Sequence, residues 1–478
     1  MNNTNQTSAL ISIGEAIRKQ EGSAKKTYIA SVRVAPGSYL AAASVLTFSA
    51  ALLLRSEMFS SALIAVTVAW GVIPALAFTD KIAFDGRFLI RRGLVPLIIQ
   101  LISGRRQRLS IADLERVDTN AVRTLRRGGR VRYRYRSQVT GQGASFTFAS
   151  SGRGYREIVR QLFPLIHDDK IDLRTRELRD YLCDPKSLNR RVEELQLASA
   201  DVLDEATLEF KLGGKKKKEP GEVRRPTTPS THDIERAFLL RQLGNNLRIA
   251  GRLREAGEAF RRALNVLPGD GWLIYDFARL LRSQASALGD ARLLTRARAA
   301  LRLSSRRANK DASLLSLIGE SFLECSEATR AERSFQRTVD LEPRNFRARI
   351  GLADVALRNG KLAHVIHQYR DAAEATSEKA LVAYARREAD YYVRLSDDDN
   401  YLSAELNRIN WLQTLTGVRR LAARVTNASV LIALAGPFIA TEIGEIGWAL
   451  ASSSLLAWLS SLLATKILSE RRNPHPVE

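Results

Sequence analysis

The sequence predicts a multi-domain membrane protein with four transmembrane helices, a small α+β domain and an all-α array of helix pairs. Three observations predict this fold class. Four apolar stretches without Asp, Glu, His, Lys or Arg occur as two close pairs, one toward each end of the chain. Apolar and polar residues alternate over 130–136 and again over 144–148, as they do in half-buried β-strands. A set of residues recurs at a constant distance within 232–395, which indicates an internal repeat.

Composition narrows the functional classes. The 478 residues carry 74 Lys and Arg against 51 Asp and Glu, a formal net charge of +23. This excess favours an acidic partner or an anionic surface. The two cysteines, Cys183 and Cys325, exclude a disulfide framework and a cysteine-based zinc site, and they fit a reducing compartment.

The apolar stretches are long enough to cross a bilayer. The predicted spans form two hairpins, 34–78 (spans 34–54 and 58–78) and 425–465 (spans 425–441 and 446–465). At about 1.5 Å per residue, a 21-residue helix such as 34–54 crosses the hydrocarbon core. The third span is the weakest, because it is short and contains Asn427 and Pro437. Since no span carries an ionisable side chain, we expect anchors rather than a transport pathway.

The orientation of the spans follows from their flanks. Lys and Arg residues lie on one side of every span, whereas the two short turns on the other side hold one Arg and three Glu. This bias predicts that the N-terminal segment 1–33, the C-terminal tail 466–478 and the whole middle of the chain are cytoplasmic. Because the N-terminus is polar, we do not expect a cleaved signal peptide.

The first cytoplasmic domain is expected at 79–183 and reads as mainly β. Within Arg130–Arg136, Val131, Tyr133 and Tyr135 lie on one strand face and the four arginines on the other. A glycine-containing turn leads to a strand at 144–148 with an aromatic inner face. Earlier strands are expected at 82–91 and 114–122, and a helix at 153–167 that Pro164 ends or bends.

Strands closed by one C-terminal helix, directly after a membrane hairpin, resemble the bacterial pleckstrin-homology-like domains of small membrane proteins. The resemblance is carried by the Phe84-Asp85-Gly86 turn, Leu89–Gly93, Leu109–Val117 and the final hairpin with its helix. It implies binding of anionic lipid headgroups or of a protein, and it places the chain in a bacterial inner membrane. The apolar stretch 94–102 is expected to be a core strand; the alternative is a segment that dips into the headgroup region.

The arginine face and a lysine run are candidates for anionic lipid binding, because guanidinium groups offer paired donors to phosphate oxygens. The candidate residues are Arg130, Arg132, Arg134, Arg136, Lys215, Lys216, Lys217 and Lys218. The lysines belong to 184–231, which reads as a helix followed by a basic, flexible linker. A solvated charged surface is the alternative interpretation. Nucleic acid is disfavoured, since the tyrosines lie on the face opposite the arginines and cannot stack on bases beside them.

The repeat occupies 232–395. A set of positions in the first unit recurs 75 residues later, which equals one 34-residue unit plus one unit longer by seven. The first unit has Leu243, Gly244, Leu247, Ala256, Phe260, Ala263 and Pro268, and the recurrence has Ile318, Gly319, Phe322, Ala331, Phe335, Thr338 and Pro343. We expect four repeats, 237–270, 271–311, 312–345 and 346–379, then a capping helix to 395 and a connecting helix over 396–424.

This spacing resembles the tetratricopeptide repeat (TPR), a helix–turn–helix unit. Gly244 and Gly319 are expected where paired helices approach closely, Phe260 and Phe335 between units, and the prolines where second helices end. The resemblance implies a superhelix whose first helices line a groove, with Arg241, Asn245, Tyr275, Arg279, Glu320, Arg347 and Asp354 on the groove side. Arg241 and Asn245 match the start of the carboxylate clamp of chaperone-binding members, but Asp276, Ser313 and Leu317 depart from it.

No catalytic motif is evident, so we expect no enzyme activity. His364 and His367 lack a third ligand for a metal, and no glycine loop for phosphates appears; no cofactor is expected. The sequence therefore favours a membrane-anchored scaffold or adaptor that binds an acidic or C-terminal peptide in the groove at the cytoplasmic face. An anionic-lipid-sensing regulator and an accessory subunit of a larger membrane complex are the alternatives. The partner and the oligomeric state stay open.

Overall fold

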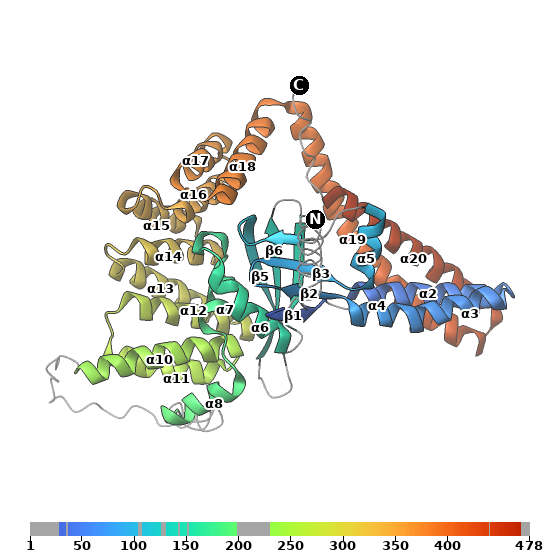
Figure 1. Ribbon diagram of the computed structural model, residues 1–478, viewed down its shortest axis with the longest axis horizontal. Coiled ribbons are helices and arrows are strands. Elements are labelled where there is room, and N and C mark those ends of the chain that lie inside the picture. The colour runs from blue at the N-terminus through green and yellow to red at the C-terminus, as the bar shows by residue number, and fades with distance from the viewer. Residues whose placement is uncertain are drawn as a thin grey trace, which may run out of the picture. The chain divides into compact units, whose positions relative to one another are not determined.

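The computed structural model describes residues 28–34, 37–103, 108–125, 131–141, 144–150, 153–197, 230–438 and 440–469 (Figure 1). Its contacts divide the chain into two compact units. The first unit falls within Met1–Leu40, Trp70–Lys361 and Gln368–Arg386, and the second within Ala41–Ala69, Leu362–His367 and Arg387–Glu478. The first unit contains the strands and most of the repeat helices, and the second contains most of the long apolar helices.

Two antiparallel sheets form the β part of the first unit. The four-stranded sheet has the order β1 (Ala30–Arg33), β2 (Lys81–Phe84), β3 (Phe88–Arg92) and β4 (Arg108–Ser110). The three-stranded sheet has the order β5 (Leu114–Leu125), β6 (Val131–Gly141) and β7 (Ala144–Ala149). Helix α6 (Arg153–Leu162) follows β7. Both sheets and α6 share one core, which includes Ile82, Phe84, Leu89, Val139, Phe148, Tyr155 and Leu162.

The hairpin of β6 and β7 confirms the alternation read from the sequence. Arg132, Arg134 and Arg136 are exposed, whereas Phe146 and Phe148 are buried. The strand pairing sets Ser137 opposite Phe148, so the aromatic residues of β7 lie on the same face as the small residues of β6. Helix α6 ends before Pro164, as the sequence predicted, and a 3-10 turn at Phe163–Leu165 continues the chain.

Strand β1 lies before the first apolar helix, outside the interval 79–183 expected for this domain. It pairs antiparallel with β2, with Arg33 opposite Lys81. The chain therefore leaves the sheet after Arg33 and returns to the same end of the sheet at Lys81. The carboxylate of Asp80 is buried there and accepts hydrogen bonds from the Tyr39 hydroxyl at 2.5 Å and from Arg91 Nη2 at 2.6 Å. These bonds join the two chain ends that flank the apolar hairpin.

The core strand expected over 94–102 is wrong: this stretch is helix α5 (Leu94–Ser103). Gly93 ends β3 with a φ of +146°, and a Cβ atom at this position would lie 2.8 Å from the carbonyl oxygen of Thr79. The change of direction at Gly93 removes the following residues from the sheet. Leu94 and Leu97, one turn apart on α5, are about half exposed and so lie outside the core of the β domain.

Two short helices follow the β domain. A 3-10 turn at Asp168–Lys170 leads into α7 (Leu173–Tyr181), and α8 (Pro185–Glu194) comes next. Helix α8 lies in the segment 184–231, where the sequence predicted a helix before the linker. The predicted linker, 213–229, and the end of the helix predicted before it lie outside the described residues.

The array of helix pairs is confirmed. Its helices are α10 (Thr231–Ala250), α11 (Leu253–Val266), α12 (Gly271–Leu288), α13 (Ala291–Arg307), α14 (Ala312–Glu324), α15 (Ala328–Leu341), α16 (Phe346–Arg358), α17 (Leu362–Ala375) and α18 (Lys379–Asp397). The second repeat, 271–311, is longer than the first, and its extra residues lengthen α12 and α13 rather than forming a loop. First helices begin at side-chain caps, because Asp270, Asp311 and Asn345 each accept a hydrogen bond from the backbone N–H three residues on.

The glycine and phenylalanine roles expected from the repeat are also confirmed. A Cβ atom on Gly244 would lie 2.8 Å from the ring of Phe260, and one on Gly319 would lie 2.6 Å from the ring of Phe335. The Phe335 ring also contacts Gly351 of the next unit, where a Cβ atom would lie 2.4 Å away. A single buried ring therefore closes one helix pair and joins it to the next.

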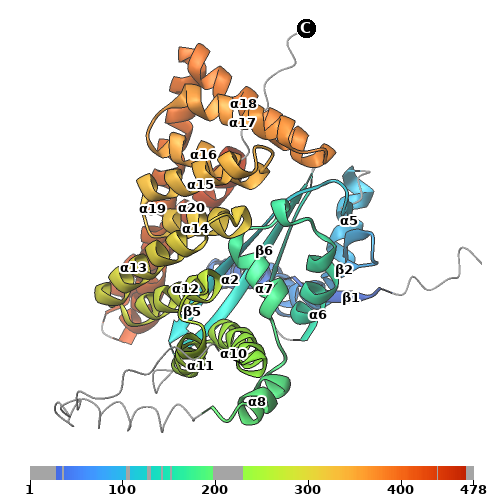
Figure 2. The ribbon, with the colours of Figure 1, turned by 90° about the vertical axis from the view of Figure 1, so that its left-hand side faces the viewer.

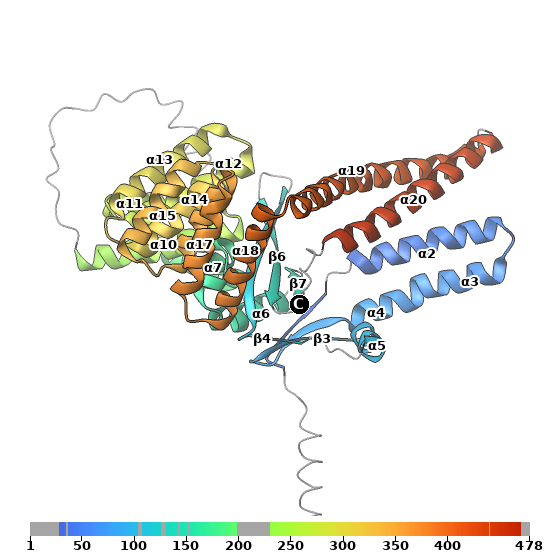
Figure 3. The ribbon, with the colours of Figure 1, turned by 90° about the horizontal axis from the view of Figure 1, so that it is seen from above.

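The second unit is built from long helices, which Figure 3 shows as hairpins. They are α2 (Gly37–Arg55), α3 (Phe59–Thr67), α19 (Asp399–Ala435) and α20 (Thr441–Ser469). Within this unit Arg55, the last residue of α2, pairs with Glu445 at 2.9 Å, and the Phe48 and Trp448 rings lie 5.6 Å apart. Helix α3 continues through a π-helical turn (Val68–Val72) into α4 (Ile73–Thr79), which belongs to the first unit.

Two helices among the described residues are long and apolar enough to cross a membrane, rather than the four expected. They are Phe59–Thr79, of 21 residues, and Thr441–Ser469, of 29 residues. The apolar helix at Tyr39–Arg55 is shorter. The third predicted span, 425–441, is the end of α19, and this helix stops at Ala435 because Pro437 cannot continue its hydrogen bonding.

Candidate functional site

The groove side of the repeat array faces another part of the same chain. Helix α7 lies against the first helices of the repeats, and strand β5 contacts α7 on its other side (Figure 2). Leu173, at the start of α7, belongs to the same apolar cluster as Tyr275, Leu314 and Phe335. The β domain and the repeat array are thus joined through the surface that the sequence assigned to a partner.

Strand β5 determines where α7 begins. Asp172 caps the helix by accepting hydrogen bonds from the backbone N–H of Thr175, at 3.0 Å, and of Thr119 on β5, at 3.1 Å. The buried hydroxyl of Thr119 bonds to those of Thr175 and Ser137, at 2.8 and 2.9 Å. Burial raises the pKa of Asp172, and the hydrogen bonds from Thr175 oppose this rise. The helix is therefore attached to the sheet at a defined residue.

The principal contact of α7 with the repeats is an ionic cluster around Glu177. Its carboxylate pairs with Arg248 of α10 and with Arg279 of α12, the latter at 3.0 Å. Burial alone would raise the pKa of Glu177, but the positive charges of Arg248 and Arg279 outweigh burial and lower it. Glu177 is therefore ionised and occupies the position in which an acidic ligand would meet these arginines.

The predicted groove residues at this end have partners within the chain. Arg241 pairs with Asp276 at 2.6 Å and lies over the ring of Trp272. Asp276 is one of the residues at which the sequence departs from a carboxylate clamp. Asn245 is buried and accepts a hydrogen bond from Arg248 at 3.2 Å. The buried Tyr275 hydroxyl accepts one from Arg279 at 3.2 Å.

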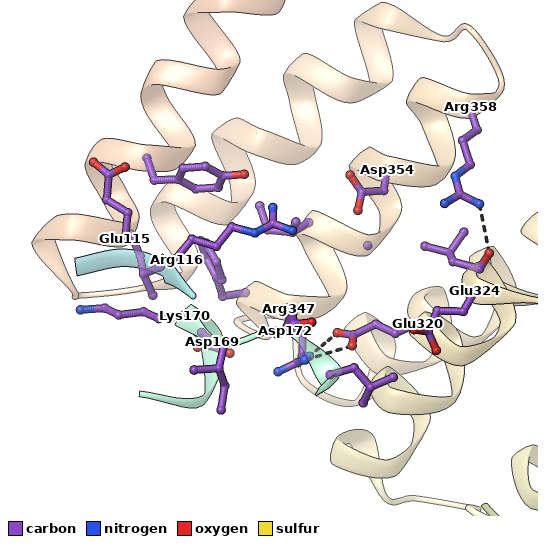
Figure 4. A pocket seen from close by; sticks show the side chains of 18 residues that line it. Glu115, Arg116, Asp169, Lys170, Asp172, Glu320, Glu324, Arg347, Asp354 and Arg358 are labelled. Atoms are coloured by element: carbon purple, nitrogen blue, oxygen red, sulfur yellow. Dashed lines mark hydrogen bonds and ion pairs between the residues drawn. The ribbon is translucent and has the colours of Figure 1, made fainter. Parts of the chain in front are cut away.

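At the other end of the groove side, three predicted residues surround a cavity of about 280 Å³. Figure 4 shows Glu320, Arg347 and Asp354 around it, with the Arg347 guanidinium turned toward the Glu320 carboxylate. Arg347 Nη2 lies 2.9 Å from Glu320, and its Nη1 donates to the carbonyl oxygen of Asp168 at 3.0 Å. Asp354 is exposed.

The lining of this open cavity is mixed in charge. Its carboxylates are Glu115, Asp169, Asp172, Glu320, Glu324 and Asp354, and its cations are Arg116, Lys170, Arg347 and Arg358. Burial raises the pKa of Asp169, with the nearby charge of Arg347 acting against it. Tyr384 and Leu381 add apolar surface. The arginine excess expected for the groove is absent from this cavity.

The structure describes only some of the candidate lipid-binding residues. Arg132, Arg134 and Arg136 are exposed on one face of β6, opposite Tyr133 and Tyr135. The Tyr135 hydroxyl donates to the carbonyl oxygen of Ile249 on α10 at 2.7 Å. Arg130 and Lys215, Lys216, Lys217 and Lys218 lie outside the described residues.

Sequence reasoning missed α7 and its charged residues. Asp172 followed by Thr175 and then by Leu178 is a helix-start signal that could have located α7. No pattern in the chain pairs Glu177 with Arg248, which lies 71 positions later. That pairing depends on how the β domain packs on the repeats.

Comparisons with known proteins give structural neighbours only. No family model matches the chain, and no curated protein matches it. Among solved structures, a crystal structure of MamA is 16% identical and covers 30% of this chain and 80% of its own, with a TM-score of 0.26. Pseudomonas aeruginosa pilF is 16% identical and covers 50% of this chain and 100% of its own, with a TM-score of 0.31.

A third neighbour is YrrB, described as a TPR protein with an unusual peptide-binding site. It is 13% identical and covers 42% of this chain and 98% of its own, with a TM-score of 0.26. At such TM-scores neither a shared overall fold nor a shared function follows. The series of helix pairs is seen directly in helices α10 to α18 of the chain itself.

Proposed function

We propose that the protein is a membrane-anchored scaffold that binds a protein partner on the groove side of its repeat array. The observation that carries this proposal is the open cavity between α14, α16 and the segment before α7. Helix α7 fills the neighbouring part of the groove side, and this cavity is left for a ligand. Its size and mixed lining suit a few side chains of a bound segment better than a whole helix.

The charge of the open cavity bears on the kind of segment bound. An acidic or C-terminal peptide, as the sequence predicted, would meet six carboxylates and four cations there. Like charges brought together at an interface disfavour binding. We therefore propose a segment that carries both signs of charge, with an apolar side chain against Tyr384 and Leu381. A binding role of this kind requires no catalytic residue.

Membrane anchoring is supported by the surface of the apolar helices. Within Phe59–Thr79 only 11% of the most apolar window is buried, and within Thr441–Ser469 only 17%. Leu63, Ile64 and Trp70 are each about two-thirds exposed. Exposed apolar surface of this extent is unfavourable in water, at about 25 cal/mol per Å². A hydrocarbon environment would remove this penalty, and the Lys and Arg flanks favour a cytoplasmic repeat array.

Site-specific photo-crosslinking in cells tests the partner site. A photoreactive residue at Ile350, which lines the open cavity, is expected to trap a discrete partner. The same residue at the exposed position Glu332 of α15 is the matched control and should trap none. Equal adducts at both positions would contradict the proposed site. Alkaline extraction of the membrane fraction tests anchoring separately, because an anchored protein remains in the pellet.

A second candidate function, sensing of anionic lipids, is favoured by the exposed arginine face of β6. A test of lipid binding needs the full chain. An isolated domain that starts at residue 79 would lack β1, which belongs to the sheet. In nanodiscs, Arg132→Glu with Arg134→Glu is expected to change the protection of β6 from hydrogen exchange only when anionic lipid is present. A change that is independent of lipid would count against sensing.

A further inference from the structure

A second cavity, of about 410 Å³, lies beside the middle of α7. Strands β5 and β6, helix α7 and the repeat helices α10, α12 and α14 all contribute to its wall. Its residues are Ala121, Arg123, Tyr133, Tyr135, Arg174, Glu177, Leu178, Arg248, Ile249, Arg282, Ser283, Ser286 and Glu324. We call it the basic cavity. It is distinct from the open cavity, although Glu324 contributes to both.

Positive charge dominates the basic cavity. Four arginines line it, against the two carboxylates of Glu177 and Glu324. Glu177 forms ion pairs with Arg248 and with Arg279, and Arg279 is not itself part of the cavity wall. Glu324 forms an ion pair with Arg282. Arg174 lies 4.0 Å from Glu324, and Arg123 is exposed at the rim. The lining therefore has a formal excess of two positive charges.

Some of the buried donors have no acceptor. Within the part of the chain that the structure describes, Arg248 Nε, Arg279 Nε and Arg279 Nη2 have no hydrogen-bond partner. Arg248 is 6% exposed and Arg279 is 4% exposed. Buried donors of charged groups are normally satisfied, and leaving them unsatisfied is unfavourable by roughly 1–3 kcal/mol each. The buried arginines of this cluster therefore have more N–H donors than acceptors.

Arg282 shows the same imbalance. Burial, together with the charges of Arg279 and Arg174, lowers its pKa to about 10. An added anion would relieve this repulsion. Phosphate suits the site well, because guanidinium groups bind its oxygens through paired hydrogen bonds and its charge of nearly −2 at neutral pH matches the excess. The hydroxyls of Ser286 and Tyr133 add neutral donors at the wall.

We propose that the basic cavity binds a phosphate group, and that bound phosphate links the β domain to the repeat array. Arg123 and Arg174 would bind it from the β domain and α7, and Arg248 and Arg282 from the repeats. The phosphate belongs either to a small soluble molecule or to a lipid headgroup. This site differs in ligand and position from the proposed partner site.

Calorimetric titration of the full chain tests the proposal. The probes are inorganic phosphate and glycerol 3-phosphate, added to protein in phosphatidylcholine nanodiscs, and separately nanodiscs that also contain phosphatidic acid. We expect one saturable site. Binding of the soluble probes identifies a soluble phosphate, whereas binding confined to phosphatidic acid identifies a headgroup. The variant Arg174→Gln should weaken binding about tenfold, the usual effect of losing a charged hydrogen bond.

Two further variants separate binding from folding. Arg123→Gln removes an exposed rim charge and should also weaken binding with little effect on thermal unfolding. Arg333→Gln removes the same charge from an exposed site on α15, away from the basic cavity, and should leave binding unchanged. The absence of saturable binding of every probe would overturn the proposal, as would equal weakening by Arg333→Gln and Arg174→Gln. The photo-crosslinking result at Ile350 is independent of these outcomes.

Discussion

The two ends of the groove side use equivalent helix positions in different ways. At the α10–α12 end, α7 covers the arginines and places Glu177 between them. At the α14–α16 end, the chain leaves a cavity whose carboxylates outnumber its cations. Groove residues of a helical repeat are therefore covered, or left beside a cavity, according to what the rest of the chain brings to them. The following four predictions test this contrast.

The largest effect is expected from Glu177→Gln at the α10–α12 end of the groove side, which α7 covers and which we call the filled end. Removing this carboxylate leaves Arg248 and Arg279 buried without a counter-charge, and breaking a buried ion pair from one side destabilises by about 3–5 kcal/mol. Urea unfolding of the full chain in detergent measures the loss. Glu332→Gln, at an exposed site on α15, is the control and should be nearly neutral. A loss below about 1 kcal/mol for Glu177→Gln would contradict the view that α7 is held by this cluster.

A smaller loss, of about 1–3 kcal/mol, is expected from Gly251→Ala. Gly251 follows α10 with a φ of +83°, and a Cβ atom would lie 2.1 Å from the carbonyl oxygen of Val131 on β6. Gly289→Ala is a matched control, because Gly289 has a φ of +70° and no atom within 4 Å of the added Cβ. Only Gly251→Ala should increase hydrogen exchange in β6. Equal effects of the two substitutions would show that this contact does not join the domains.

The stability of the filled end should also depend on pH. The folded pKa of Glu177 lies below its ordinary value of 4.5, so the native state binds fewer protons than the unfolded state. The resulting stability is present above pH 4.5 and is lost as the pH falls through the folded pKa. The difference in unfolding free energy between the wild type and Glu177→Gln should therefore shrink below pH 4.5. A difference that stays constant with pH would exclude an ionised Glu177.

The smallest effect on stability is expected at the open end. Asp354→Asn changes an exposed side chain of the cavity wall, so the free energy of unfolding should change by less than about 0.5 kcal/mol. Partner crosslinking through Ile350 should nevertheless decrease, since Asp354 lines the same cavity. A large destabilisation would mean that this end, too, is part of the internal packing.

Much of the repeat array could be predicted because its determinants are local. Gly244 with Phe260, and Gly319 with Phe335, recur at the spacing of the helix pairs, and each pair meets within its own unit. The alternation in β6 likewise follows from a period of two. Strand β1 and helix α5 were not predicted. Strand β1 is four residues long and pairs with a strand about fifty positions later, and the turn at Gly93 depends on the approach of Thr79.

By itself, the sequence determined the helix pairs, the hairpin of β6 and β7 and the two long apolar helices, Phe59–Thr79 and Thr441–Ser469. These features depend on the order of residues along one helix or strand, or on contacts between neighbouring helices. Only the tertiary structure decided that α7 lies against the groove residues, that Arg241 is neutralised by Asp276, and that arginines from four elements meet in the basic cavity. Those arrangements depend on the distance and burial of charges on separate elements, and charge interactions of this kind are not encoded by spacing along the chain.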